Sequence, residues 1–276
     1  MAVSPAASPA AADSAEKLYS DITTVFPDLI ADFNNKWTAW AHTWFPNERP
    51  NEKPNSTSVS PRSSSASDRC LVPEFKQLTA LGPKIIPLVV YKLASEPQNF
   101  LGVQLYNGLE KDKNYLVNPA DLANYKVLQR QANLIVGMNY DRNKLVQARI
   151  EAWKAHCMRS HVQSSSAMYT ECQEYNELLE LDGSIISHLM VAYSRDQTCF
   201  WFELLHEIVH GFGKKTGLRT IDFKQQYAAW NSWFQEMEHD KAPRWPQVYP
   251  QLRLIGSFKL VAYVEFLPLR FPSSHE

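Results

Sequence analysis

The chain carries two copies of one apolar pattern, 100 residues apart. Segment 74–81 reads EFKQLTAL, and segment 174–181 reads EYNELLEL. Later matches are Ile85 with Ile185, Ile86 with Ile186, Phe100 with Phe200, and Leu105 with Leu205. The shared positions are mostly apolar or turn-forming, which is what a repeated helical hairpin needs in order to pack. The sequence therefore predicts two related helical hairpins.

Composition points to an all-α fold with a substantial core. The 276 residues are 45% hydrophobic and include eight Trp, as in a globular protein. Only nine are Gly, which favours helices over a turn-rich β architecture. The net charge of −1 argues against nucleic acid and against an anionic membrane surface as partners.

Targeting signals and cysteine spacing bear on location. The first 17 residues lack the positive and apolar regions of a signal peptide, and no apolar run reaches about 18 residues, the length of a membrane span. The four cysteines form no C-x-x-C pair, so we expect free thiols in an intracellular, cytoplasmic protein.

Composition shifts divide the chain into five parts. Residues 1–13 are expected to be a flexible tail, and residues 14–45 to form N-terminal helices. Residues 46–69 contain four Pro, seven Ser and no aromatic residue, which predicts a disordered loop. Residues 70–240 are the main all-α domain. Residues 241–276 form a C-terminal extension that becomes rich in β-branched and aromatic residues, with no evident partner strand.

Helical spacing of apolar residues predicts several further elements. Two longer helices are expected at 119–137 and 140–160, and an amphipathic helix at 222–239. Pro27 suits a helix start. The stripe Trp37, Trp40 and Trp44 is interpreted as core rather than as a ligand cage.

Two segments carry a family resemblance. The first hairpin contains LGPKIIPLVV at 81–90, which looks like the core of a HEAT-type hairpin. Its pairing with LLHEIVHG at 204–211 resembles a group of poorly characterised helical proteins of filamentous fungi. The resemblance covers about residues 70–240. It implies a HEAT-like fold in one domain and a fungal source, but no established chemistry.

The second segment also contains an H-E-x-x-H motif: His206, Glu207 and His210. On a helix, residues i and i+4 lie one above the other, so both histidines could reach one metal ion. Glu207 would then be the general base for a bound water. This short motif resembles that of zincin metallopeptidases. The resemblance implies a zinc-dependent hydrolase acting on a small molecule or a peptide.

A catalytic zinc also needs a third protein ligand. Thr216 stands where the longer metzincin motif has its third histidine. Glu236, Glu238 and His239, at the end of the predicted helix 222–239, are the remaining candidates. An antiparallel helix would place them nearer Cys199 than His210, which is unfavourable for coordination.

Three alternatives stay open. The motif residues, with Glu203, face away from the apolar side of their helix and could be an ordinary solvated face. They could also form a metal-free site in which His206 or His210 is the acid–base catalyst. Finally, the chain could be a non-catalytic HEAT-like binding or scaffold protein.

Other chemistry-bearing residues give weaker signals. His156, Cys157, His161 and Cys172 could form a second metal site, although a buried thiol and surface histidines are the simpler interpretation. His188 lies in an apolar segment and is expected to be hydrogen-bonded within the core.

Overall fold

The computed structural model describes residues 7–44, 69–118, 125–159, 167–218 and 221–245. Within these ranges every regular element is a helix, which confirms the all-α prediction. The α-helices are α1 Pro9–Val25, α2 Pro27–Ala41, α3 Pro73–Ala80, α4 Ile86–Ser95, α5 Gly102–Leu109, α6 Tyr125–Arg159, α7 Ala167–Thr170, α8 Gln173–Leu179, α9 Ile186–Arg195, α10 Trp201–His210 and α11 Phe223–Glu236. The 3₁₀ turns are η2 Pro83–Ile85, η3 Pro97–Leu101, η4 Lys113–Tyr115, η6 Asp182–Ile185 and η7 His239–Lys241.

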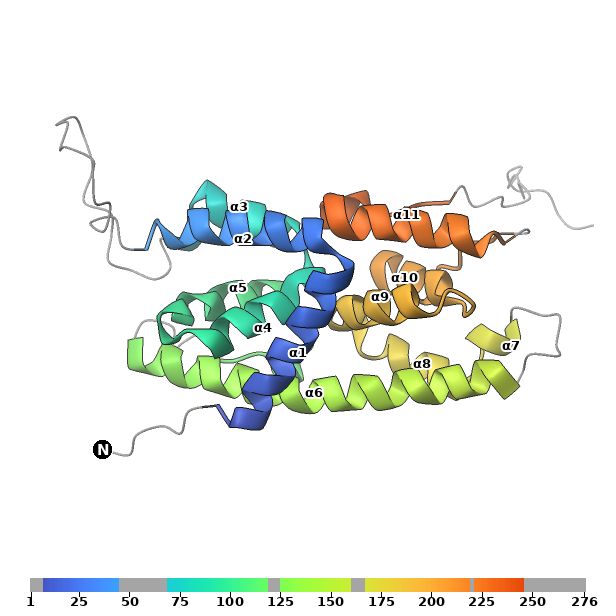
Figure 1. Ribbon diagram of the computed structural model, residues 1–276, viewed down its shortest axis with the longest axis horizontal. Helices are drawn as coiled ribbons and strands as arrows, with labels where there is room; N and C mark the ends of the chain where they lie inside the picture. Colours follow the sequence, from blue (N-terminus) through green and yellow to red (C-terminus); the bar gives the residue numbers. More distant parts are fainter. Residues whose placement is uncertain (1–6, 45–68, 119–124, 160–166, 219–220, 246–276) are drawn as a thin grey trace, which may run out of the picture.

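The long helix α6 runs along one side of the whole molecule (Figure 1). Helices α4 and α5 pack on one half of it, and α8 and α9 pack on the other half. Helices α2, α3 and α11 lie on the opposite side, where α11 contacts α2. Helix α1 crosses between these layers and contacts α4, α6 and α9. The motif helix α10 is thus held between α8, α9 and α11.

The two predicted hairpins share several local backbone features. In each copy a short helix leads into a left-handed residue, Gly82 (φ 73°) or Asp182 (φ 51°), which starts a 3₁₀ turn. Ile85 (φ −95°, ψ 1°) and its counterpart Ile185 (φ −99°, ψ 0°) then begin α4 and α9. The prediction that both isoleucine pairs lie buried in helical segments is confirmed.

The two copies meet through these turns. The Ser187 hydroxyl donates a hydrogen bond to the Lys84 carbonyl, so the start of α9 is joined to η2. Gly183 is needed at the contact, because a β-carbon there would lie 2.8 Å from Cγ of Pro83. Lys84 is fully buried, and its ammonium group donates to the carbonyls of Trp233 and Phe234 at the end of α11. The repeated turns therefore fix α9 and α11, the neighbours of α10, relative to each other.

Several expectations about helix boundaries are corrected. The tail expected at 1–13 contains the start of α1, because the Ser8 side chain caps the helix, Pro9 occupies its first turn and Ala11 is only 1% exposed. The two helices expected at 119–137 and 140–160 are one helix, α6, over the residues described. Gly137 costs about 1 kcal/mol in a helix, which the burial of its neighbours outweighs.

Other expectations hold or lie outside the described chain. Pro27 begins α2, and Trp37, Trp40 and Trp44 are buried core residues. The predicted helix 222–239 is α11, which ends at Glu236. The loop at 46–69 lies outside the described residues apart from Arg69, and the extension at 241–276 is described only as far as Trp245.

Membrane-spanning potential is limited in the described ranges. No single helix there is both long and apolar enough to cross a bilayer. The pair Pro73–Ala80 and Pro83–Ser95, bent by 91°, meets the length and composition requirement only when its two parts are taken together.

Candidate functional site

The H-E-x-x-H motif lies on α10 as predicted, but its polar side is covered. His206 is 4% exposed and Glu207 is 2% exposed, so the interpretation as a solvated face is wrong for these two residues. Helix α10 ends at His210, and Gly211 (φ 115°) turns the chain back over the helix. This turn also leaves the Phe212 side chain 80% exposed.

Both carboxylate oxygens of Glu207 are engaged by neighbouring donors. The Tyr175 hydroxyl donates to Oε1 over 2.7 Å, and the Gly213 backbone N–H donates to Oε2 over 2.8 Å. The Lys215 ammonium group forms an ion pair with Oε1 and lies 4.5 Å from the centre of the Tyr175 ring. A buried carboxylate with three such donors is a structural anchor for the returning loop, not a base facing a water molecule.

Glu203 holds the same loop. Its Oε2 accepts a hydrogen bond from the backbone N–H of Thr216 over 2.9 Å, and its Oε1 accepts one from the Thr216 hydroxyl. Both acids therefore bind the segment that follows α10, and Thr216 has a role in packing.

His206 and His210 remain together as a pair of rings, with centroids 4.5 Å apart. Burial, and next the neighbouring His210, lower the pKa of His206 to about 4. Burial is also the main cause that lowers the pKa of His210, with smaller contributions from the cations Arg244 and Lys214. Both imidazoles are therefore neutral at physiological pH.

The tautomer of His210 follows from its contact with the chain beyond α11. Its Nε2 lies 2.8 Å from the Pro243 carbonyl oxygen, which can only accept, so Nε2 carries the proton and Nδ1 carries a lone pair. Trp245 covers the other ring, with its centroid 5.6 Å from that of His206. His206 Nδ1 is buried without a hydrogen-bond partner among the described residues.

The predicted third zinc ligands do not join this pair. Glu236 is exposed and accepts a hydrogen bond from Ser232, and Glu238 is exposed and pairs with Lys241 at 3.2 Å. The pKa of His239 is lowered to about 4, chiefly by burial. In the described ranges, no set of three His, Cys, Asp or Glu ligand atoms within 4.8 Å includes His206 or His210.

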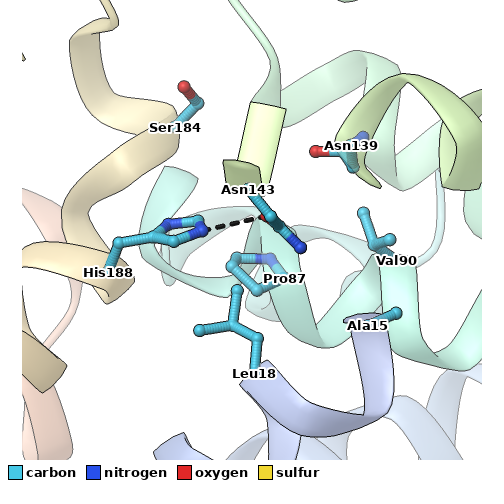
Figure 2. Close-up of a pocket in the computed structure, with 8 residues that line it drawn as sticks. All are labelled: Ala15, Leu18, Pro87, Val90, Asn139, Asn143, Ser184 and His188. Carbon is cyan, nitrogen blue, oxygen red and sulfur yellow. Dashed lines mark hydrogen bonds between the residues drawn. The ribbon is translucent and has the colours of Figure 1, made fainter. Parts of the chain in front are cut away.

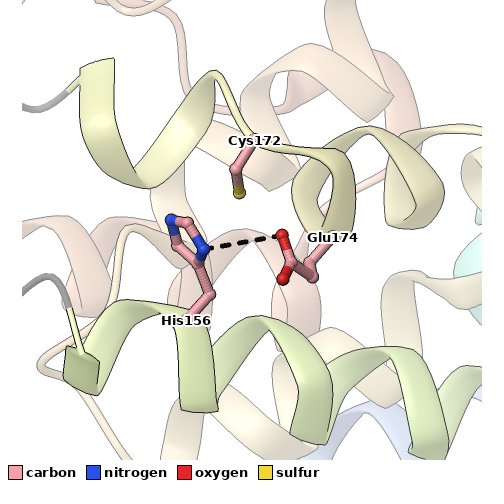
Figure 3. A group of neighbouring side chains, drawn as sticks. All are labelled: His156, Cys172 and Glu174. Carbon is pink, nitrogen blue, oxygen red and sulfur yellow. Dashed lines mark ion pairs between the residues drawn. The ribbon is translucent and has the colours of Figure 1, made fainter.

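The second predicted cluster is rearranged. The structure brings His156 and Cys172 together with Glu174, which the sequence analysis missed (Figure 3). Cys157 is buried and its thiol contacts that of Cys199, while His161 lies outside the described residues. The C-x-E spacing of Cys172 and Glu174 is the signal that could have found the third member.

His188 is half-buried beside a small cavity between α1, α4, α6 and η6 (Figure 2). Its Nε2 lies 2.9 Å from the Asn143 side-chain oxygen, and burial lowers its pKa to about 3. The cavity has a volume of about 10 Å³, which is room for one water molecule at most. This small cavity is therefore part of the packing, not a ligand site.

A larger hollow of about 360 Å³ lies between the end of α2 and the α4–η3 region. The Trp37 and Trp44 rings line it together with Lys92 and Glu96. None of the predicted site residues lines this hollow, so it is separate from the motif.

Comparison of the chain with protein-family models, with curated proteins and with solved structures finds no significant match.

Proposed function

We propose that this protein is an enzyme that uses His210 as a general acid–base group, without a metal, on a small molecule. The observation that carries the proposal is the state of His210: a neutral, half-buried imidazole whose Nε2–H donates to the Pro243 carbonyl. This bond orients the ring and leaves Nδ1 as the proton acceptor, which is how acid–base histidines are held. His206, buried behind it, is the positioning residue.

The surroundings suggest a substrate class. Lys214 and Arg244 are exposed, and both lower the pKa of His210 through their charge. Two cations beside a neutral base favour an anionic molecule such as a carboxylate or a phosphate ester. The Trp245 ring, half-buried over the histidine pair, offers an apolar surface for the rest of the molecule.

The positions of the candidate third zinc ligands and of the candidate base favour a metal-free mechanism over a zinc-dependent one. A zinc mechanism needs a third ligand and an available base. Both carboxylate oxygens of Glu207 already interact with Tyr175, Gly213 and Lys215, so Glu207 is not available as the base. Glu236 and Glu238 interact with other side chains and do not supply the third ligand. A peptide substrate was expected only for a zinc-dependent hydrolase, so we do not propose one for the metal-free enzyme.

Chelator-treated protein should be screened against small carboxylates and phosphate monoesters, following both turnover and the imidazole NMR signals. We expect a substrate to shift the His210 signals and to be turned over without metal. Turnover should be lost in His210→Gln and kept in the control His42→Gln, whose histidine follows α2. Signals of His210 that no compound shifts, or turnover that His210→Gln retains, would contradict the acid–base role.

A second candidate function is a non-catalytic HEAT-like binding or scaffold protein. The observation that favours it is the similar order of helix, 3₁₀ turn and helix in the two hairpins, with a residue of positive φ, Gly82 or Asp182, at the turn of each. HEAT-like hairpins usually serve as a binding surface. The resemblance to helical proteins of filamentous fungi agrees with this candidate only. The four free thiols support a cytoplasmic location for either function.

A further inference from the structure

A second site of a different chemical kind lies at the far end of α6. His156 comes from the last turns of α6, Cys172 from the residue before α8, and Glu174 from the first turn of α8 (Figure 3). One ligand atom from each residue lies within 4.8 Å of the other two. All three side chains are half-buried, so solvent ions can reach them.

The geometry points to a zinc site formed by His156, Cys172 and Glu174, with a fourth position left for water. Imidazole nitrogen, thiolate sulfur and carboxylate oxygen are the three ligand types that zinc uses in proteins. The site is separate from His206 and His210 and does not depend on the function proposed for them.

The orientation of His156 suits a metal ligand. Its Nε2 lies 2.9 Å from the Met168 carbonyl oxygen, so Nε2 is the donor and Nδ1 points toward Glu174. Metal-binding histidines usually donate their second ring N–H to a carbonyl or carboxylate in this way, which fixes the tautomer and the ring plane. The α7 segment thus supplies the outer support that a zinc ligand needs.

The separation of the ligand atoms also fits. Two ligand atoms at about 2.1 Å from a tetrahedral zinc lie about 3.4 Å apart. His156 Nδ1 and Glu174 Oε2 are 3.5 Å apart, which is longer than an ordinary hydrogen bond and close to that value. The other oxygen of Glu174 lies 3.8 Å from the Arg159 guanidinium, so the carboxylate keeps one oxygen for the metal.

Cys172 must lose its proton to bind. Its thiol now donates a weak hydrogen bond to the Tyr169 carbonyl over 3.8 Å, and burial raises its pKa. On binding, the S–H bond breaks, the sulfur lone pair goes to zinc and the proton goes to buffer. Zinc uptake should therefore release the Cys172 thiol proton.

The test uses the full-length, reduced, chelator-treated protein, titrated with Co²⁺ alone and then with Zn²⁺ alone. One equivalent of Co²⁺ should give a thiolate-to-cobalt charge-transfer band, and Zn²⁺ should displace the cobalt and remove the band. Cys172→Ser should lose the band and weaken Zn²⁺ binding by roughly 100-fold or more. The matched control Cys70→Ser, at a half-buried thiol near Gln104, should keep both.

Two further variants keep the result interpretable. If Cys172→Ser loses helical circular dichroism, Glu174→Gln, at the half-buried carboxylate, should still fold and weaken Zn²⁺ binding by roughly 10-fold or more. His206→Ala should bind Zn²⁺ as the unchanged protein does. The inference is overturned if the charge-transfer band is absent, if it persists in Cys172→Ser, or if His206→Ala abolishes it. An ordinary His156–Glu174 ion pair would then explain the cluster.

Discussion

Replacing Glu207 with Gln tests whether this residue is a structural anchor or a catalytic base. Glutamine keeps the size of the side chain but replaces one accepting oxygen with an amide that donates. The amide N–H groups of glutamine would therefore point at one or more of the three donors that now bind the carboxylate: Tyr175, Gly213 and Lys215. Two donors cannot form a hydrogen bond with each other. Because Glu207 is 2% exposed, water cannot compensate for the lost hydrogen bonds.

The expected cost follows from these contacts. Losing hydrogen bonds to a charged, buried group costs about 1.5–3 kcal/mol, and an unsatisfied donor adds about 1–3 kcal/mol. Lys215 is partly exposed, so its ion pair is screened and contributes the least. We expect Glu207→Gln to lower the free energy of unfolding by about 2.5–6 kcal/mol. At about 2–4 °C per kcal/mol, the Tm should fall by roughly 5–24 °C.

Denaturant unfolding and calorimetry of Glu207→Gln would measure this loss, with Glu236→Gln as the exposed control on α11. The control should change the free energy of unfolding by less than about 0.5 kcal/mol. A similarly small effect of Glu207→Gln would refute the anchoring role, because a catalytic base can be neutralised without loss of stability.

Three further predictions concern the turns and the core. Gly82→Ala should lower the free energy of unfolding by about 2 kcal/mol or more, because alanine is strained at φ 73° and its methyl group would lie 2.5 Å from His239; thermal unfolding measures this. Lys84→Met should cost about 1–3 kcal/mol in denaturant unfolding, because it leaves the buried Phe234 carbonyl at the end of α11 without a donor, whereas the Trp233 carbonyl keeps the Met237 N–H. Between about pH 6.5 and 3, the unfolded chain binds a proton at His188 that the folded protein does not, so stability should fall as the pH falls. His188→Gln should flatten that pH dependence, and an unchanged slope would contradict it.

Local sequence patterns predicted which segments are helical better than they predicted where each helix begins and ends. The isoleucine pairs at 85–86 and 185–186 are buried where a fixed apolar offset placed them, and Pro27 begins a helix. The continuity of α6 through Gly137 was not predicted, because packing on both halves of the molecule outweighs the local propensity for a break.

The site was predicted only in part, because its surroundings also depend on tertiary contacts. The sequence identified His206 and His210 and placed them on one helix. It did not predict that Glu207 is anchored by Tyr175, which is 32 residues away, or that a loop after Gly211 covers the motif. A polar face on a helical wheel has the same appearance whether solvent, a cleft or another segment lies over it, so only tertiary contacts distinguish these cases.

The central claim is that His206 and His210 are a neutral, metal-free pair with the proton of His210 on Nε2. Long-range ¹H–¹⁵N NMR spectra of ¹⁵N-labelled, chelator-treated protein, recorded from about pH 8 down to about pH 4.5, report both the tautomer and the charge. We predict an Nε2–H tautomer for His210, a pKa of His206 near 4, and no shift of either ring on addition of Zn²⁺. A His206 pKa at the ordinary value of about 6.5, or a shift of both rings by one equivalent of Zn²⁺, would contradict the claim.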